Sequence, residues 1–408
     1  MLRRTIVSLV LVAVAAATGC PRDRAEDGKL DLDYWEKWTR FEGEAMRQVV
    51  RRFNEHPERA RDHIVVRQIT VSNIDRKSLV AIAGGNPPDL VGLWSSNVAA
   101  FADQGALEPL DDYLKRDGLG PDHWVRIYWE MCEHRGHVWA VPTTPSVTAL
   151  LWNKAMFRDA AVELRAAGLD PNRAPRTLEE LDRYAEVLTK RDAGGNLIQV
   201  GFLPQEPDWF TWAYGLWFGG ALYRDGRITA NDPRNIEAME WVRRFTLKYG
   251  RPAIEKFTSG FGNFASAQNP FFCGKVAMVL QGVWMYNFIT QYAPGMEWGA
   301  APWPQTPHGP AGFACAETDV LAIPRGVPRD RAEAAWKFLR FVSSQEGTEL
   351  LCLGHRKSSP LARVSPEFLD KHPHPYIRLL DELARGPGVA RQPSLGMWAE
   401  YQNEWTWA

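Results

Sequence analysis

The sequence has no excess of charge of either sign and, after its first twenty residues, no long apolar run. Its 408 residues contain 48 Lys and Arg against 49 Asp and Glu, a formal net charge of −1. A membrane-spanning helix needs about 20 consecutive apolar residues, and nucleic-acid binding needs clustered basic residues that neutralise phosphates. We therefore expect no membrane-spanning helix in the globular part and no nucleic-acid partner.

Motifs that carry common catalytic and cofactor chemistry are also missing. The chain has no Gly-x-Ser-x-Gly nucleophile turn, no His-Glu-x-x-His zinc motif, no Cys-x-x-Cys pair and no glycine loop that would cradle phosphates. His134 and His137 lie three residues apart without further ligands beside them, so we interpret them as surface histidines. We expect neither a metal site nor a cofactor.

The first twenty residues have the pattern of an export signal. Two arginines precede an apolar run over residues 6–17, which is too short to span a bilayer, and small residues lead up to Cys20. The pattern predicts a lipoprotein signal peptide over residues 1–20, lipid attachment to Cys20 and a flexible tether over residues 21–29. An uncleaved membrane helix and a plain signal peptide are the alternatives. We therefore expect a protein of the cell envelope, exported and lipid-anchored to the membrane.

Apolar periodicity alternates between strand and helix in the first part of the chain. Residues 32–35, 64–69 and 90–93 are predicted as strands, and residues 45–53 and 75–82 between them have helical spacing. A strand–helix–strand run of this kind produces a parallel sheet.

The same alternation continues to the end of the chain. N-cap signals at Thr177 and Asp232 predict two helix starts, residues 275–280 and 320–324 are predicted as strands, and residues 331–343 as a helix. There are no internal repeats, so the sequence predicts an α/β fold throughout.

Tryptophan is the most over-represented residue type. The chain has 18 tryptophans, roughly three times the usual share, and many lie in polar turns. An indole offers a flat surface to the apolar face of a sugar, although core packing is the alternative for each one. Trp94 and Trp284 directly follow predicted strands and Trp38 lies just after the first, at the sheet edge where α/β proteins bind ligands. The pattern favours a carbohydrate site at that edge.

Several segments resemble, in order and spacing, the extracellular solute-binding proteins of sugar ABC importers, the maltose-binding-like group. They are residues 86–94, 105–113, 138–154, 274–284 and 318–346. The resemblance covers nearly all of the mature chain. It implies a two-lobe periplasmic-binding-protein fold of type II, an α/β fold with central mixed sheets flanked by helices and a hinge between the lobes.

The resemblance also implies a division of the chain and a function. One lobe would hold residues 30–144 and 303–343, the other residues 145–302 and 344–408, and a ligand would close the cleft between them. The protein would be the substrate-binding lipoprotein of an ABC transporter. It would capture a carbohydrate, a short oligosaccharide, and deliver it to a membrane permease. It would act as a monomer and not as an enzyme.

Positions that match the family supply the candidate ligand contacts. Aromatic residues would stack on sugar rings, and charged residues would bind sugar hydroxyls. The candidates are the aromatic residues Trp94, Trp209, Phe210, Trp212, Trp284 and Trp398, the acids Glu42 and Glu317, and also Trp38, Arg40 and Arg356. An ordinary acid at a helix N-terminus is the alternative for Glu42, and a solvated loop charge is the alternative for Arg356.

Two other functions fit parts of this pattern. An exported glycoside hydrolase also uses aromatic residues and needs two carboxylates, for which Glu42, Glu317, Asp319 and Glu400 are available, but their spacing singles out no pair. A membrane-anchored sugar sensor would bind glycan without an importer. The presence or absence of neighbouring permease genes separates the sensor from the transporter component.

Four cysteines follow Cys20, namely Cys132, Cys273, Cys315 and Cys352. The expected compartment is oxidising. The predicted lobes place Cys132 with Cys315 and Cys273 with Cys352, so pairing within each lobe and four buried free thiols are both open.

Overall fold

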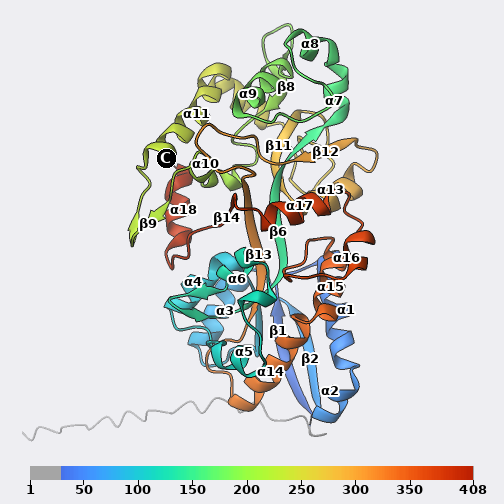
Figure 1. Ribbon diagram of the computed structural model, residues 1–408, viewed down its shortest axis with the longest axis vertical. Helices are drawn as coiled ribbons and strands as arrows, with labels where there is room; N and C mark the ends of the chain where they lie inside the picture. Colours follow the sequence, from blue (N-terminus) through green and yellow to red (C-terminus); the bar gives the residue numbers. More distant parts are fainter. Residues whose placement is uncertain (1–28, 408) are drawn as a thin grey trace, which may run out of the picture.

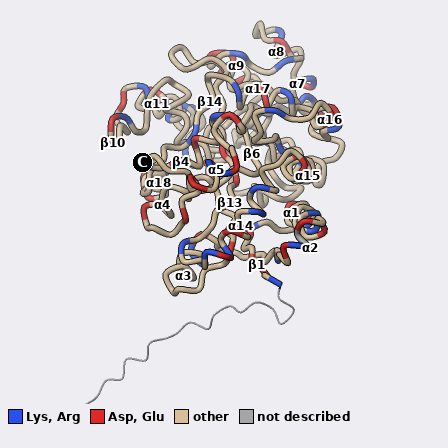
Figure 2. Tube along the Cα trace, turned by 60° about the horizontal axis from the view of Figure 1, so that its bottom comes forward, with Lys and Arg blue, Asp and Glu red and all other residues tan. Residues whose placement is uncertain are grey.

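The computed structural model describes residues 29–407, which form two lobes joined by long strands (Figure 1). The predicted signal peptide, Cys20 and residues 21–28 of the predicted tether lie outside the described residues. Within residues 29–407, none of the helices has the length and apolar character needed to cross a bilayer. Acidic and basic residues are interspersed over both lobes (Figure 2).

Strands and helices alternate along the described chain. The strands are β1 (Leu30–Glu36), β2 (Ile64–Thr70), β3 (Leu90–Trp94), β4 (Glu133–His134), β5 (His137–Val138), β6 (Val141–Asn153), β7 (Lys190–Arg191), β8 (Leu197–Phe202), β9 (Tyr223–Arg224), β10 (Arg227–Ile228), β11 (Val276–Gly282), β12 (Trp298–Ala301), β13 (Ala314–Ala322) and β14 (Val389–Ala390). The helices are α1 (Arg40–Asn54), α2 (Pro57–Asp62), α3 (Ile74–Ala83), α4 (Ser95–Asp103), α5 (Asp111–Arg116), α6 (Arg126–Glu130), α7 (Lys154–Asp159), α8 (Ala161–Ala166), α9 (Leu178–Val187), α10 (Ala213–Trp217), α11 (Pro233–Tyr249), α12 (Arg251–Thr258), α13 (Met285–Tyr292), α14 (Arg329–Val342), α15 (Gln345–His355), α16 (Pro366–Asp370), α17 (Ile377–Arg385) and α18 (Trp398–Trp407), with the short 3-10 turns η1 (Pro121–His123) and η2 (Asp208–Phe210).

The first lobe is built as its periodicity predicts. β1 pairs in parallel with β2 on one side and β3 on the other. α1 buries an apolar stripe that includes Met46, Val49 and Phe53, and each such side chain removed from water contributes about 1.5–3 kcal/mol. The predicted strand–helix–strand run and its parallel sheet are confirmed.

Two helices of the second lobe begin at the predicted N-caps. The Thr177 hydroxyl accepts a hydrogen bond from the backbone N–H of Glu180 at 3.2 Å, and the Asp232 carboxylate accepts one from the N–H of Arg234 at 2.9 Å. These side chains satisfy N–H groups that have no partner inside the helix. The predicted starts of α9 and α11 are therefore confirmed.

A ten-stranded mixed sheet runs through both lobes in the order β2-β1-β3-β13-β6-β11-β8-β7, with β12 on β6 and β14 on β13. β13 is antiparallel to both β3 and β6. The long strands β6 and β13 pass from one lobe to the other (Figure 1). Their pairing shifts register between Thr318 and Val320, a bulge that bends strands where the lobes meet. The predicted two-lobe α/β fold with mixed sheets and flanking helices is confirmed.

Two buried clusters show which segments pack in each lobe. The second-lobe cluster includes Trp303 and residues 314–316, whereas the first-lobe cluster includes Leu351. The second-lobe cluster also includes Val125, Ile127, Tyr128 and Met131, so the clusters do not divide the chain at single positions, and the predicted lobe boundaries stay a prediction. β13 contributes side chains to both clusters, and α15 packs on α1. There Gly354 approaches so closely that a Cβ on it would lie 2.5 Å from the Cβ of Ala45.

The four described cysteines are all free thiols. Cys132, Cys315 and Cys352 are buried, and Cys273 is exposed. Neither disulfide considered from the sequence is present in the described residues, and the alternative of four buried thiols is wrong for Cys273.

Candidate ligand-binding site

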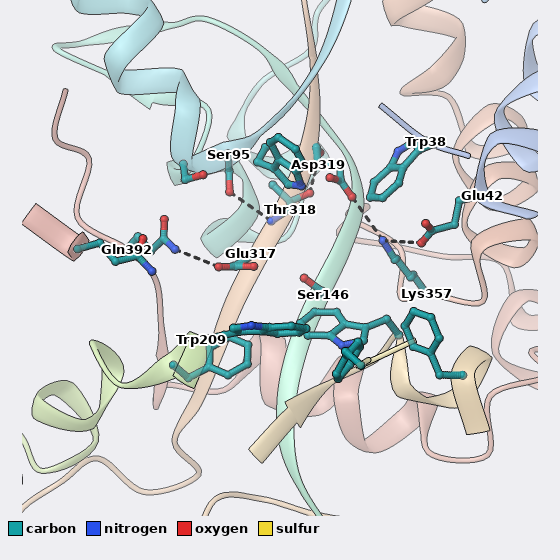
Figure 3. A pocket seen from close by; sticks show the side chains of 17 residues that line it. Trp38, Glu42, Ser95, Ser146, Trp209, Glu317, Thr318, Asp319, Lys357 and Gln392 are labelled. Atoms are coloured by element: carbon teal, nitrogen blue, oxygen red, sulfur yellow. Dashed lines mark hydrogen bonds and ion pairs between the residues drawn. The ribbon is translucent and has the colours of Figure 1, made fainter. Parts of the chain in front are cut away.

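A cavity of about 600 Å³ lies where the two lobes face each other (Figure 3). Strand ends, helix starts and loops from both lobes contribute to its lining. The lining residues are Trp38, Glu42, Trp94, Ser95, Ser96, Ser146, Trp209, Phe210, Phe264, Trp284, Phe288, Glu317, Thr318, Asp319, Lys357, Gln392 and Gln402. Cavities of this size bind small molecules in many proteins.

One side of the cavity is an aromatic wall made of Trp209, Phe210, Phe264, Trp284 and Phe288 of the second lobe. The ring centroids of Trp209 and Phe264 lie 4.6 Å apart, and those of Phe264 and Phe288 lie 5.3 Å apart. Phe210 and Trp284 are stacked, with an interplanar angle of 22°. Each ring is therefore fixed by its neighbours, which gives a rigid apolar surface.

Trp284 owes its position to the end of β11. Its indole N–H donates to the side-chain oxygen of Gln281 at 3.0 Å. The ring folds back over Gly282, where a Cβ would lie only 2.3 Å from it. A glycine at position 282 is therefore required for the indole to lie in the wall.

Trp94 supplies an aromatic surface from the first lobe. It is the last residue of β3, and α4 begins at the next residue. The ammonium group of Lys37 lies 5.0 Å from the centre of its ring. Because the indole remains 42 % exposed, most of its other surface is open to a guest.

A charged cluster consists of Glu36, Lys37, Glu42, Asp319 and Lys357. Figure 3 shows three of its members, Glu42, Asp319 and Lys357, opposite the aromatic wall. The Lys37 ammonium lies 3.2 Å from Asp319 and 3.4 Å from Glu36. The Lys357 ammonium lies 3.5 Å from both Asp319 and Glu42. Negative and positive groups thus alternate, and the lysine side chains are only 6 % and 5 % exposed.

The ionisation of this cluster follows from its pairing. Burial opposes ionisation of Asp319, but Lys37 and Lys357 hold the pKa of that carboxyl below its ordinary value. Burial also opposes the charge on Lys357, but Asp319 and Glu42 raise the pKa of its ammonium group. Burial raises the pKa of Glu42, against the opposing effect of Lys357. Asp319 and Lys357 are therefore both charged at neutral pH.

Glu317 lies on β13 beside this cluster but has a different environment. Its carboxylate accepts a hydrogen bond from the Gln392 amide at 3.0 Å. Among the ion pairs of the described residues, none includes Glu317. Burial and then the charge of Asp319 raise the pKa of Glu317 to about 7. This carboxyl group therefore titrates near neutral pH.

Seven of the predicted contacts line the cavity. They are Trp38, Glu42, Trp94, Trp209, Phe210, Trp284 and Glu317. Trp38 differs from the other indoles, because the ammonium groups of Lys37 and Lys357 each lie 4.5 Å from its ring centre. Its π surface is occupied by cations, so it positions the two lysines.

Four of the predicted contacts do not line the cavity. Trp212 and Trp398 are 1 % and 3 % exposed and pack edge to face against each other in the second-lobe core. For these two tryptophans, the alternative of core packing therefore holds. Arg40 reaches across to the hydroxyl of Tyr292 at 3.5 Å, and the Arg356 guanidinium lies 5.7 Å from the ring centre of Tyr286. Trp212 and Trp398 are thus core residues, whereas Arg40 and Arg356 make contacts outside the lining of this cavity.

Ten lining residues were not among the predicted ligand contacts, and most of them are polar. They are Ser95, Ser96, Ser146, Phe264, Phe288, Thr318, Asp319, Lys357, Gln392 and Gln402, of which Asp319 was named only as a carboxylate for the hydrolase alternative. Asp319 was detectable, because it lies two positions after Glu317 on a strand and alternate strand residues share a face. Lys357 comes from the loop after α15 and has no comparable local signal.

The described residues contain no group of three or more His, Cys, Asp or Glu side chains that could hold a metal ion. His137 is exposed, with its Nδ1 atom 3.2 Å from Asp111. His134 is buried, and its ring nitrogens lie 2.8 Å from Asp103 and 3.0 Å from the Ser394 hydroxyl. The interpretation as a surface histidine is therefore wrong for His134.

Two α/β lobes joined by crossing strands, with a cavity between them, define a ligand-binding protein of the periplasmic type. The chain belongs to the bacterial extracellular solute-binding protein family, whose sequence pattern matches residues 40–349. Members of this family bind solutes and are not enzymes, so the hydrolase alternative is set aside.

Individual relatives share about a quarter of their residues with this chain. A putative binding protein of Brucella abortus is 24 % identical over 276 residues, which cover 66 % of this chain and 62 % of the relative. The maltotriose-binding protein of Pyrococcus abyssi is 25 % identical over 279 residues, which cover 67 % of this chain and 55 % of the relative. The alignments thus span less than two thirds of these curated relatives. The solved structure of CpMnBP1 with mannobiose bound is 26 % identical, with a TM-score of 0.76, and the match covers 92 % of this chain and 93 % of that one.

Proposed function

We propose that the protein captures a short oligosaccharide in the cavity between its lobes and delivers it to a membrane permease of the ABC type. The observation that carries this proposal is that the aromatic wall of one lobe faces polar and charged groups across the cavity (Figure 3). A pyranose ring has an apolar face and a polar rim, so it needs both kinds of surface at once.

The exposure of the indoles supports this ligand class. Trp94 and Trp209 remain 42 % and 43 % exposed on opposite sides of the cavity. Large aromatic groups that are held rigid but left open to solvent mark a binding surface. Sugar rings stacked on them would remove that apolar area from water, while Glu42, Glu317 and Asp319 accept hydrogen bonds from hydroxyls.

The relatives point in the same direction. CpMnBP1 was solved with mannobiose bound, and the Pyrococcus abyssi protein is a maltotriose-binding protein. Mannobiose and maltotriose are short oligosaccharides, and a cavity of about 600 Å³ suits ligands of this size.

The bend between the lobes supports capture by closure. At the register shift of β6 and β13, the hydroxyl of Thr143 donates to the backbone carbonyl of Asp319 at 3.0 Å, and that of Thr144 donates to its carboxylate at 2.6 Å. A ligand that contacts both lobes binds the closed form better than the open form, and this difference drives closure. We infer that the importer recognises the closed, loaded protein.

Export and anchoring complete the proposal. Lipid on Cys20 would hold the protein at the membrane surface, and residues 21–29 would let the lobes reach a permease. Anchoring keeps the captured sugar close to the transporter and raises its effective concentration there.

The proposal is tested by titrating purified protein with mannobiose, mannotriose, maltotriose, an amino-acid mixture and peptides, by calorimetry and tryptophan fluorescence. We expect binding of at least one oligosaccharide. Binding of an amino acid or peptide, with no response to any sugar, would overturn the substrate class.

Single variants tie the binding to the cavity. Trp94→Ala and Trp209→Ala should each weaken sugar binding at least about tenfold, the scale of loss at a binding hot spot. Trp35→Ala is the matched control, because Trp35 packs on the first-lobe core and does not line the cavity. Equal losses in all three variants would contradict the assignment of the site.

A further inference from the structure

Both ammonium groups at the cavity are already neutralised by the protein. Lys37 contacts Asp319 at 3.2 Å and Glu36 at 3.4 Å, and it also donates to the backbone carbonyl of Leu93 at 3.2 Å. Lys357 lies 3.5 Å from Asp319 and 3.5 Å from Glu42. A guest carboxylate or phosphate could pair with either lysine only by displacing one of these carboxylates.

The remaining space around the lysines is aromatic. Each ammonium group lies 4.5 Å from the centre of the Trp38 ring, and Lys37 also lies 5.0 Å from that of Trp94. The negative faces of the indoles complete the surroundings of each cation. Lys37 does not line the cavity, and Lys357, which does, is paired with two carboxylates, so neither ammonium group is a free site for an anion.

Carboxyl groups outnumber the cations at this side of the cavity. Glu36, Glu42, Glu317 and Asp319 face two ammonium groups, and Lys357 is the only Lys or Arg in the cavity lining formed by residues 29–407. Arg391, near Glu317, is held by Glu130 at 3.5 Å. The local field is therefore negative, and a like charge brought into it is repelled.

We propose that the cleft discriminates by charge, binding uncharged sugars and excluding uronic acids and sugar phosphates of the same shape. This inference rests on the proposed function and narrows its substrate class. Discrimination arises here by repulsion, since the aromatic wall and the hydroxyl acceptors would serve either kind of ring equally well.

Matched disaccharides measure this discrimination directly. Mannobiose, galactobiose and cellobiose are titrated by calorimetry at pH 8 and 20 mM salt, each against the disaccharide of the corresponding uronic acid. We expect at least one neutral disaccharide to bind and its acidic counterpart to bind at least about 100-fold more weakly, because like charges in a desolvated site are strongly unfavourable. An acidic disaccharide that binds as tightly as its neutral partner, or more tightly, overturns the inference and leaves a carbohydrate function standing. No binding by any member of the three pairs contradicts the inference, and it overturns the proposed function as well if mannotriose and maltotriose also fail to bind.

Variants locate the source of the repulsion. Glu317→Gln should reduce the ratio of neutral to acidic affinities about tenfold, because it removes a carboxylate that has no cationic partner. Glu297→Gln is the matched control, since Glu297 lies on the surface in an ion pair with Arg158 at 2.8 Å, and it should leave the ratio unchanged. If Glu317→Gln fails to fold, Glu42→Gln is the second test: it leaves Lys357 with Asp319 as its one carboxylate partner and should likewise reduce the ratio. A ratio unchanged in the folded variant contradicts the inference.

Discussion

Replacing Glu317 by Gln should make the ligand-free protein more stable at pH 8 but not at pH 4.5. In the native state, burial and the charge of Asp319 raise the pKa of Glu317 to about 7, whereas an unfolded Glu has a pKa near 4.3. Between these values the folded protein keeps a proton that the unfolded chain releases. Glu317 therefore lowers the free energy of unfolding progressively as the pH rises through this range. Gln has the same shape and no charge, so the free energy of unfolding of the variant does not decrease in this way as the pH rises.

The size of the effect follows from the pKa difference. A pKa difference of roughly 2.7 corresponds to about 3.7 kcal/mol as an upper bound. The Glu317 side chain is only half-buried, and its hydrogen bond from Gln392 at 3.0 Å becomes weaker when the acceptor is neutral. We therefore expect a gain of about 1–2 kcal/mol at pH 8. For a chain of this length, that gain raises Tm by about 1–3 °C.

The assay is thermal unfolding of the ligand-free protein and the variant at pH 4.5, 6 and 8. The gain should be absent at pH 4.5, intermediate at pH 6 and largest at pH 8. Glu297→Gln is again the control, because Arg158 lowers the pKa of Glu297 and loss of that pair should not stabilise the fold at any of these pH values. A Glu317→Gln variant that is no more stable than the natural protein at pH 8, or equally stabilised at pH 4.5, refutes the reasoning.

Three further predictions concern binding and anchoring. Sugar affinity measured by calorimetry should fall about tenfold from pH 8 to pH 6, because the pKa of Glu317 is about 7 and its protonated form is the poorer hydroxyl acceptor. An affinity that does not change between these pH values would exclude a sugar contact through this carboxylate. Gly282→Ala should weaken sugar binding at least about tenfold with circular dichroism unchanged, since a Cβ would lie 2.3 Å from the Trp284 ring; unaltered affinity would remove Trp284 from the site. Cys20→Ser should shift the exported protein from the membrane to the soluble fraction and abolish its labelling with palmitate, and persistent labelling would exclude Cys20 as the lipid site.

Local signals predicted several of the helices and strands but not which core each segment joins. α1 was predictable because its apolar residues recur at helical spacing, and α9 because Thr177 caps it. No local pattern reports that β13 leaves one core and enters the other within nine residues. Nor does any local pattern report that α15 returns to the first lobe, since its packing depends on Gly354 meeting Ala45, about 300 positions away in the sequence.

The indoles show the same limit within one short segment. Trp209 and Trp212 are three residues apart in similar surroundings, yet Trp209 is 43 % exposed and Trp212 is 1 % exposed. The difference arises because α18 brings Trp398 against Trp212, while Trp209 packs beside Phe264 at the cavity. Residue type and flanking turns predicted an aromatic site, and only the tertiary contacts decide which indoles belong to it.

The charged cluster and the bend between the lobes share one residue. Asp319 holds Lys37 and Lys357 from the first lobe, and it accepts hydrogen bonds from Thr143 and Thr144 where β6 and β13 change register. Buried ion pairs cost desolvation that apolar packing would avoid, so their presence at a bend calls for a reason beyond stability. A guest whose hydroxyls compete for the Asp319 carboxylate changes the hydrogen bonds of the bend itself. Because the aromatic wall lies in the other lobe, that guest gains its full set of contacts only when the lobes come together, which couples occupancy of the cavity to the angle between them.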